Sequence, residues 1–377
     1  MKANKPLNEK ISICIPTYNR ARFLEYLLGW FADNISIILG ITIIISDDNS
    51  TDDTAEVVRR FSDFLSIKYV INPYPKGLDS NLRFAMCSAE TEYIVPLADD
   101  DFLHFDNLFS SIILLENQPD AVAIYSSMWY YDAVAGMTQG KFFELDKIFL
   151  LEKGKVAAGL NFIIDRHIFP ECAIYRKSVI DFLGSGHRHV FFPFIQFAQL
   201  ILRGHLLFQT MYCHSLFCVK HPVLLNRDNF GSFEAMELWD RTRGGLEYIV
   251  GIAKRHEQLS FADECILNAK IEKFISDRMR VAVRLHINAG NFLDAYMIAS
   301  RMRGRGEWVD VEEWDALHYL ASVAHVLKDL NLDSARLESG LSDQVSRLLD
   351  RNPRIVSTDP NSPLITHAQI SEYLNRL

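Results

Sequence analysis

Three consecutive aspartates, Asp99, Asp100 and Asp101, follow the apolar run from Tyr93 to Ala98. A short apolar run is typical of a buried strand, so these carboxylates are expected at the edge of a sheet. Neighbouring carboxylates repel one another, and a hard divalent cation with oxygen ligands would offset that repulsion. The alternative is an acidic loop in which one aspartate caps the next helix. The run by itself therefore predicts either a metal site or a helix start.

Two further polar clusters follow earlier apolar runs, at residues 16–20 and 46–50. Ligands of open α/β sheets bind beyond the carboxyl ends of the strands, so all three clusters are expected to share one cleft. Asn19 and Asn49 are equally well explained as turn residues. The adjacent pair of Asp47 and Asp48 is poorly explained in that way, which favours a binding site.

The elements that position these clusters alternate in type. Strands are predicted at 11–15, 41–45, 67–71 and 93–97, and helices at 20–31, 55–64 and 79–89. Strict alternation of strand and helix predicts an α/β fold with a parallel sheet and helices on both of its faces.

The composition changes in the second half of the chain, where charged segments with helical spacing dominate. These predicted helices lie at 233–256, 261–288, 292–302, 311–327 and 341–351. We therefore predict two domains, an α/β domain at 1–228 and an α-helical region at 229–377. The helical region is expected to serve acceptor binding or homo-oligomerisation.

The overall composition limits the classes of partner. The chain has 377 residues, of which 49% are hydrophobic, and its formal net charge is −9. Without a basic stripe, nucleic acid is not expected as a partner. No apolar run is long enough to span a bilayer. A cytoplasmic protein is predicted, and peripheral contact with the inner face of the cell membrane is left open.

The three clusters, in this order, resemble the nucleotide-sugar-dependent glycosyltransferases of family 2, which have the GT-A fold. The segments that carry the resemblance are Ile13–Arg20, Ile44–Thr54, Gly77 with Asn81, and Glu92–Asp101. The triple aspartate preceded by Leu97 and Ala98 is similar to the abequosyltransferase-like subgroup that builds bacterial surface polysaccharides, such as O-antigen and capsule.

The resemblance implies a metal-dependent, inverting transfer from a nucleoside-diphosphate sugar to a hydroxyl of a glycan or polyisoprenyl-linked oligosaccharide. It implies Mn²⁺ or Mg²⁺ held by Asp101 directly, with Asp99 near the ribose or sugar and also a candidate for the metal site. His221 is a further candidate for the metal site. The residues implied to line the donor pocket are Pro16, Thr17, Tyr18, Arg20, Asp48, Asn81, Asp99 and Asp100.

The general base that would activate the acceptor hydroxyl is not identified by the resemblance. Family members carry a Glu-Asp pair at a helix start, which would fall here near Phe192 and Pro193, where no carboxylate stands. Glu171 and His189 are equal candidates, since either could take a proton near neutral pH when suitably placed.

Two other functions stay open on the sequence alone. A sugar-phosphate nucleotidyltransferase would also use an α/β fold and acidic metal ligands, but the first strand lacks the glycine-rich phosphate loop typical of that chemistry. A non-catalytic module that binds nucleotide sugar would explain the absent Glu-Asp pair.

Overall fold

The computed structural model describes residues 5–74, 76–183, 191–224, 239–288, 292–302, 356–357 and 365–366. The chain divides into two compact units. The first comprises Met1–Asn229 with Gly244–Leu267, and the second comprises Phe230–Arg243 with Asn268–Leu377. The predicted boundary at residue 228 lies outside the described residues, so that division stays a prediction.

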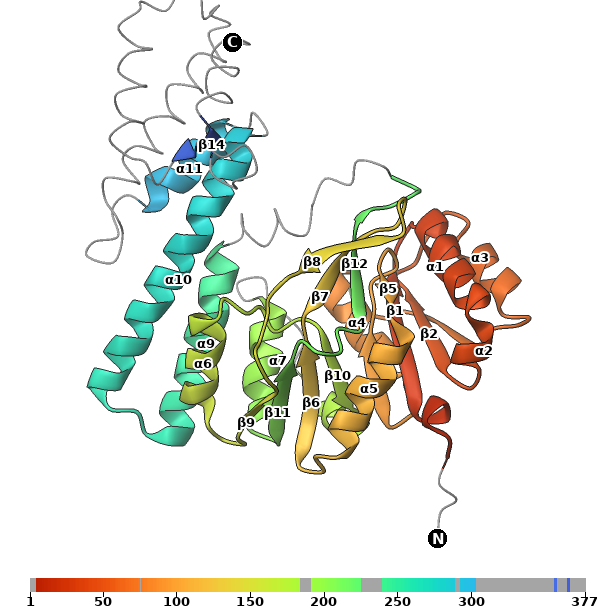
Figure 1. The fold of residues 1–377 in the computed structure, drawn as a ribbon, viewed down its shortest axis with the longest axis horizontal. Helices are drawn as coiled ribbons and strands as arrows, with labels where there is room; N and C mark the ends of the chain where they lie inside the picture. Colours follow the sequence, from red (N-terminus) through yellow and green to blue (C-terminus); the bar gives the residue numbers. More distant parts are fainter. Residues whose placement is uncertain are drawn as a thin grey trace, which may run out of the picture. The chain divides into compact units, whose positions relative to one another are not determined.

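The first unit is built on a mixed sheet with strand order β3-β2-β1-β4-β10-β6-β11-β9. Its strands are β1 (Ile11–Thr17), β2 (Thr42–Asp47), β3 (Ile67–Ile71), β4 (Tyr93–Pro96), β6 (Ala121–Ser126), β9 (Phe149–Leu151), β10 (Ala173–Arg176) and β11 (His205–Gln209). The first four strands are parallel, as the alternating pattern predicts, whereas β10 runs antiparallel to both β4 and β6. The carboxyl ends of β1, β2 and β4 therefore meet at one edge. The neighbouring strands β1 and β2 are labelled in Figure 1.

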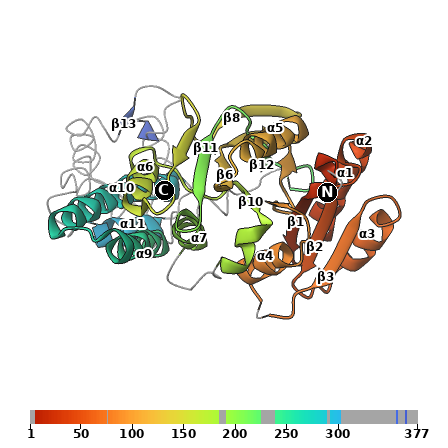
Figure 2. The same ribbon diagram turned by 90° about the horizontal axis from the view of Figure 1, so that it is seen from below.

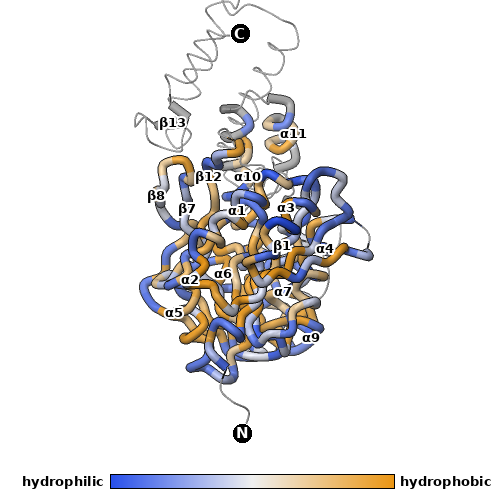
Figure 3. The backbone as a smooth tube through the Cα atoms, turned by 90° about the vertical axis from the view of Figure 1, so that its right-hand side faces the viewer, coloured by the Kyte–Doolittle hydropathy of each residue, from blue (hydrophilic) through white to orange (hydrophobic). Residues whose placement is uncertain are grey.

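Alternate residues of the strands build the core on the two faces of this sheet. On one face Ile11, Ile13 and Ile15 pack in the cluster formed with α1 (Ala21–Asp33), α3 (Thr54–Phe61) and α5 (Phe105–Glu116). The other face is covered by α4 (Leu78–Cys87) and α7 (Phe192–Ile201), which lie opposite α5 in Figure 2. Hydrophobic segments gather inside this unit (Figure 3). Burying each such isoleucine contributes about 1.5–3 kcal/mol, which fixes the sheet under the polar edge.

Several elements lie outside the sequence-based expectation. The helix α6 (Val156–Asp165) was not predicted, and neither were the short strands β5 (Phe102–Leu103), β7 (Met128–Asp132), β8 (Met137–Lys141) and β9. With β12 (Ser215–Lys220), three of them form a second sheet of order β5-β12-β7-β8. β5 continues directly from the triple aspartate, so this sheet lies beside the carboxyl edge of the main one.

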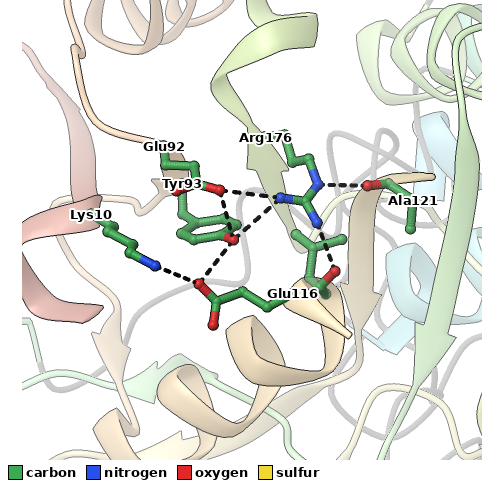
Figure 4. Close-up of polar contacts among 7 residues, drawn as sticks. Lys10, Glu92, Tyr93, Glu116, Ala121 and Arg176 are labelled. Atoms are coloured by element: carbon green, nitrogen blue, oxygen red, sulfur yellow. Dashed lines mark hydrogen bonds and ion pairs between the residues drawn. The ribbon is translucent and has the colours of Figure 1, made fainter. Parts of the chain in front are cut away.

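A polar network closes the opposite, amino edge of the main sheet (Figure 4). Arg176 donates to the main-chain oxygens of Leu115 and Ala121, each at 2.8 Å, and Nη1 donates to the Tyr93 hydroxyl at 3.2 Å. The same hydroxyl lies 3.2 Å from Glu116 Oε1. These bonds tie β4, β10 and α5 together, so this edge has a structural role and the chemistry is left to the carboxyl edge.

The helix α9 (Trp239–Glu257) follows in the chain, and its portion from Gly244 belongs to the first unit. A Cβ on Gly245 would lie 2.8 Å from Phe194 of α7, so only glycine permits this close approach. The peptide nitrogen of Ala157 in α6 donates to Glu257 at 2.7 Å, which fastens the end of α9 to the same unit.

The second unit is mainly helical where it is described, as predicted. It contains most of α10 (Phe261–Asn288) and all of α11 (Phe292–Met302), together with the two-residue strands β13 (Val356–Ser357) and β14 (Ile365–Thr366). The helices predicted at 311–327 and 341–351 lie outside the described residues. Among the helices that are described, none combines the length and apolarity needed to cross a membrane.

Candidate active site

The ends of β1 and β4 bring the first and third polar clusters into contact. The two strands are paired in parallel, and the Leu97 nitrogen donates to Cys14 at 3.0 Å just beyond the last paired residues. As a result the Thr17 hydroxyl donates to Asp99 Oδ2 at 2.8 Å, across 82 residues of sequence. The convergence predicted from the sequence is therefore present for these two clusters.

Arg20 supplies a cation to two of the three aspartates. Its Nε lies 2.8 Å from Asp99 Oδ1, and its Nη2 contacts Asp100 Oδ2. The Arg20 guanidinium carbon also lies 4.3 Å from the centre of the Phe23 ring, in a cation–π contact. The two carboxylates thus present oxygens to one positively charged group.

Burial sets the electrostatics of this pair. Asp99 is 5% exposed and Asp100 is 4% exposed. Burial raises the pKa of Asp99 well above its ordinary value, and the neighbouring Asp100 charge raises it further, while Arg20 and Thr17 act in the opposite direction. A cation at this position is what allows both carboxylates to be ionised together.

The loops after β1 and β2 hold one another in place. The Asn19 nitrogen donates to Ser50 Oγ at 2.8 Å, and Thr51 nitrogen donates back to Asn19 Oδ1 at 2.7 Å. Asp52 accepts from the Ala21 nitrogen at 2.9 Å, at the first residue of α1. Asn19 has a φ of 52°, in the left-handed region that asparagine tolerates. Asn19 has the turn role that the sequence indicates, and these hydrogen bonds fix the position of Arg20.

Asp47 and Asn81 also serve to hold the strands together. Both carboxylate oxygens of Asp47 accept hydrogen bonds, one from Ser50 and the other from the Tyr69 hydroxyl. Asn81, on α4, donates from Nδ2 to the Thr17 main-chain oxygen at 3.1 Å. Asn81 therefore contacts the end of β1, and its predicted contact with the donor stays a prediction.

Asp48 is buried and fastens the loop that follows β3. It accepts from Asn72 Nδ2 and from the Gly77 nitrogen, each at 2.8 Å. Nearby, Tyr18 is 43% exposed, and Lys76 Nζ lies 4.2 Å from the centre of its ring. Pro16 precedes them inside β1. The contacts of these residues with the nucleotide stay a prediction.

The fit of a divalent cation rests on Asp99 and Asp100. No group of three or more histidine, cysteine or acidic side chains arranged around one point is found within the described part of the chain. Mg²⁺ and its relatives are commonly held by one or two carboxylates together with phosphate oxygens of the substrate, so this pair fits such an ion. Oδ1 of Asp101 accepts from the Cys218 nitrogen at 2.9 Å. If Asp101 is a direct ligand of the ion, it would therefore bind through Oδ2.

His221 lies near this site but among aromatic rings. Its ring is fully buried, with centroid distances of 4.8 Å to Phe23 and 5.1 Å to Tyr26. Nδ1 accepts from the Val223 nitrogen at 3.1 Å. Phe23 thus contacts both His221 and the Arg20 guanidinium. The role of His221 as a metal ligand stays a prediction.

Of the two candidate bases, the structure describes Glu171. It is exposed and directly precedes Cys172, whose main-chain oxygen accepts from the Ser126 nitrogen at the carboxyl end of β6. Burial raises the pKa of Cys172 to about 11, and the charges of both Asp101 and Glu171 add to that effect. Glu171 therefore belongs to the same edge as the aspartates. His189 lies outside the described residues, and α7 begins with Phe192 and Pro193, without a carboxylate.

A buried polar cluster beside Glu171 was not predicted as a unit. His214 Nδ1 lies 2.9 Å from Ser126 Oγ, and Nε2 lies 3.6 Å from Cys172 Sγ. The Cys172 thiol donates to Ser215 Oγ at 3.0 Å. The cluster joins the ends of β6 and β10 to the start of β12. Sequence spacing gives no signal for it, because its members are far apart in the chain.

His214 should make the stability of the protein depend on pH. Burial lowers the pKa of His214 to about 4, from an ordinary value near 6.5. Between these values the unfolded ring binds a proton that the folded ring does not, so the free energy of unfolding falls as the pH falls from 6.5 to 4. The His214 share of that loss is about 3 kcal/mol. Urea unfolding across this range should show a shallower pH dependence in His214→Gln, and an unchanged one in the exposed control His256→Gln.

The comparisons with known proteins agree with this geometry. A profile of the family described as glycosyl transferase family 2 matches residues 12–184, which include Thr17, Arg20, the triple aspartate and Glu171. The chain contains a glycosyltransferase family 2 domain. The family 2 domain thus begins in β1 and ends just beyond β10.

Two curated relatives share parts of the family 2 domain. Abequosyltransferase RfbV of Salmonella typhimurium is 37% identical over 112 residues, which are 29% of this chain and 34% of that protein. A GalNAc(5)-diNAcBac-PP-undecaprenol beta-1,3-glucosyltransferase of Campylobacter jejuni is 36% identical over 96 residues, covering 25% of this chain and 30% of the relative. These matches span about a third of each relative.

A solved structure extends the likeness beyond the family 2 domain. Staphylococcus aureus TarS 1–349 in complex with UDP-GlcNAc superposes with a TM-score of 0.51 and 14% sequence identity, covering 84% of this chain and 88% of that one. At this identity the likeness concerns the fold alone. The predicted GT-A fold, followed by a helical region, is confirmed.

Proposed function

We propose that this protein transfers a sugar from a nucleoside-diphosphate sugar to a hydroxyl of a glycan or lipid-linked oligosaccharide, in the synthesis of cell-surface polysaccharide. The observation that carries the proposal is the convergence of Thr17, Arg20, Asp99 and Asp100 at the carboxyl edge of a family 2 domain. The names of the relatives, one of which acts on an undecaprenol-linked glycan, support the acceptor class.

The proposed site holds Mn²⁺ or Mg²⁺ at Asp99, Asp100 and Asp101, with His221 as a further candidate. When bound, the ion would neutralise the diphosphate and make it a better leaving group. Thr17 keeps Asp99 oriented through its hydroxyl, and Arg20 brings a second positive charge to the diphosphate. Tyr18, Asp48 and Asn81 would complete the nucleotide pocket with Pro16.

The acceptor half of the proposal requires a general base. Glu171 is proposed to take the proton from the attacking hydroxyl, with His189 as the alternative, and inversion would follow from a single in-line displacement. The family 2 domain favours sugar transfer over nucleotidyl transfer. Cytoplasmic location, contact with the inner membrane face and oligomerisation through the helical region belong to the same proposal.

A thermal-shift screen of nucleoside diphosphates with and without Mn²⁺ tests the donor half. A ligand at one hundred times its Kd stabilises the folded state by about 2.7 kcal/mol. The nucleoside diphosphate with the correct nucleobase should therefore raise the Tm by several degrees, and by more in the presence of Mn²⁺. Nucleoside monophosphates serve as the control and should give smaller shifts. The proposal is wrong if no diphosphate raises the Tm at millimolar concentration with either metal.

A further inference from the structure

The Arg20 guanidinium stands in the position where the two buried carboxylates present their oxygens. It contacts Asp99 Oδ1 and Asp100 Oδ2 at the same time, and these are the carboxylates that fit a divalent cation. A guanidinium and a divalent cation repel each other, so both cannot occupy the space between these oxygens. Any ion that binds Asp99 and Asp100 there must displace Arg20.

The two partners differ in how freely they can move. The Arg20 side chain is 37% exposed, whereas the Asp99 and Asp100 side chains are 7% and 5% exposed. The Thr17 hydroxyl holds Asp99 through its other oxygen. The main chain that follows is held at Asp101, whose carboxylate accepts from the Cys218 nitrogen. The aspartates are therefore held by the fold, and the arginine is the member of the group that can leave.

We propose that Arg20 is a resident counter-ion that occupies the acidic pair in the absence of donor and releases it when a divalent cation arrives with a diphosphate. This inference rests on the proposed function, because it takes the diphosphate as the group that receives the displaced guanidinium. Planar guanidinium groups bind phosphate oxygens in a bidentate manner, so the charge lost from Asp99 and Asp100 is regained on the ligand.

The consequence is a built-in coupling between metal and nucleotide. Mn²⁺ alone must displace Arg20 without supplying a new anionic partner for its guanidinium, so Mn²⁺ alone binds weakly. Mn²⁺ with a diphosphate gives Arg20 a new anionic partner, so the two ligands strengthen each other's binding. The protein is thus protected from holding the metal in the absence of donor.

The test measures Mn²⁺ binding by electron paramagnetic resonance of the free ion, without and with the nucleoside diphosphate found in the thermal-shift screen. Arg20→Gln should bind Mn²⁺ alone at least tenfold more tightly than the wild type, and should bind the diphosphate with Mn²⁺ more weakly. Arg22→Gln, an exposed neighbour on α1, is the matched control and should match the wild type in both measurements.

Phe23→Leu provides a second variant, since Arg20→Gln leaves two buried carboxylates without their cation and could fail to fold. It keeps the ion pairs and removes the ring that lies against both the guanidinium and His221, so a two- to fivefold tighter binding of Mn²⁺ alone is expected. Equal Mn²⁺ affinity in the wild type and both variants would overturn the role of Arg20 and leave the metal site intact. If no Mn²⁺ binds even with nucleotide, the metal part of the proposed function fails with it.

Discussion

Exchange of Asp99 for asparagine is expected to lower kcat/KM for sugar transfer by about 10³-fold and to leave the fold intact. The amide has nearly the same shape as the carboxylate, and its oxygen still accepts the Thr17 hydrogen bond. The negative charge that faces the cation and the ion pair with Arg20 are both lost. Loss of one preorganised charge contact at a reacting centre costs about 10²–10³ in rate, and a metal ligand adds to this through lost donor affinity.

Steady-state transfer assays with saturating Mn²⁺, combined with far-UV circular dichroism, would measure this effect. The matched control is Asp132→Asn in the second sheet. Asp132 is also a buried carboxylate, paired with Lys220 at 2.9 Å, but it is the last residue of β7 and accepts from the Ala135 nitrogen in the turn that follows. Its replacement should leave kcat/KM within about threefold. Retention of wild-type activity in the folded Asp99→Asn variant would contradict the proposed role of Asp99 in the donor site.

Asp101→Asn separates two roles of the third aspartate. If Asp101 only accepts the Cys218 hydrogen bond, asparagine preserves that bond and activity falls little. If Asp101 is a direct metal ligand, as proposed, the activity of Asp101→Asn falls about as far as that of Asp99→Asn. The Mn²⁺ concentration needed for the half-maximal rate then also rises. The two outcomes differ in the metal dependence as well as in the rate.

The positions of the site residues could be predicted from the sequence because strand ends are predictable. Four short runs are rich in β-branched and aromatic residues, and each contains a parallel strand of the structure: 11–15, 41–45, 67–71 and 93–97. In a parallel sheet such ends share one edge, so Thr17 and Asp99 were expected together although 82 residues separate them.

The pairing of side chains at that edge could not be predicted in the same way. Arg20 was expected in the nucleotide pocket, but its contact with Asp99 and Asp100 depends on the direction in which α1 leaves β1, which the turn at Asn19 sets. The second sheet was missed for a related reason. Its strands are only two to six residues long, and runs of that length carry too little periodicity to recognise.

Exchange of Glu171 for glutamine is expected to lower kcat for transfer by about 10²–10⁴-fold while the KM for the donor stays near its wild-type value. A general base acts on the acceptor hydroxyl in the transition state, so its loss reduces kcat and leaves donor binding unaffected. The position of Glu171 supports this choice, because it directly precedes Cys172, whose main-chain oxygen accepts from the Ser126 nitrogen at the carboxyl end of β6. Glu90→Gln, an exposed carboxylate before β4 that pairs with Lys68, is the matched control.

The pH profile of kcat distinguishes a base from a residue that merely shapes the acceptor site. With Glu171 as the base, the acidic limb of the profile disappears in Glu171→Gln, and His189→Gln keeps that limb. The opposite pattern would assign the proton transfer to His189, in the segment between β10 and α7. If both variants keep kcat within twofold, the acceptor hydroxyl is activated by neither group. If Asp99 acts on donor binding and Glu171 on proton transfer, as proposed, the double variant Asp99→Asn/Glu171→Gln should show nearly additive losses in the free energy of activation.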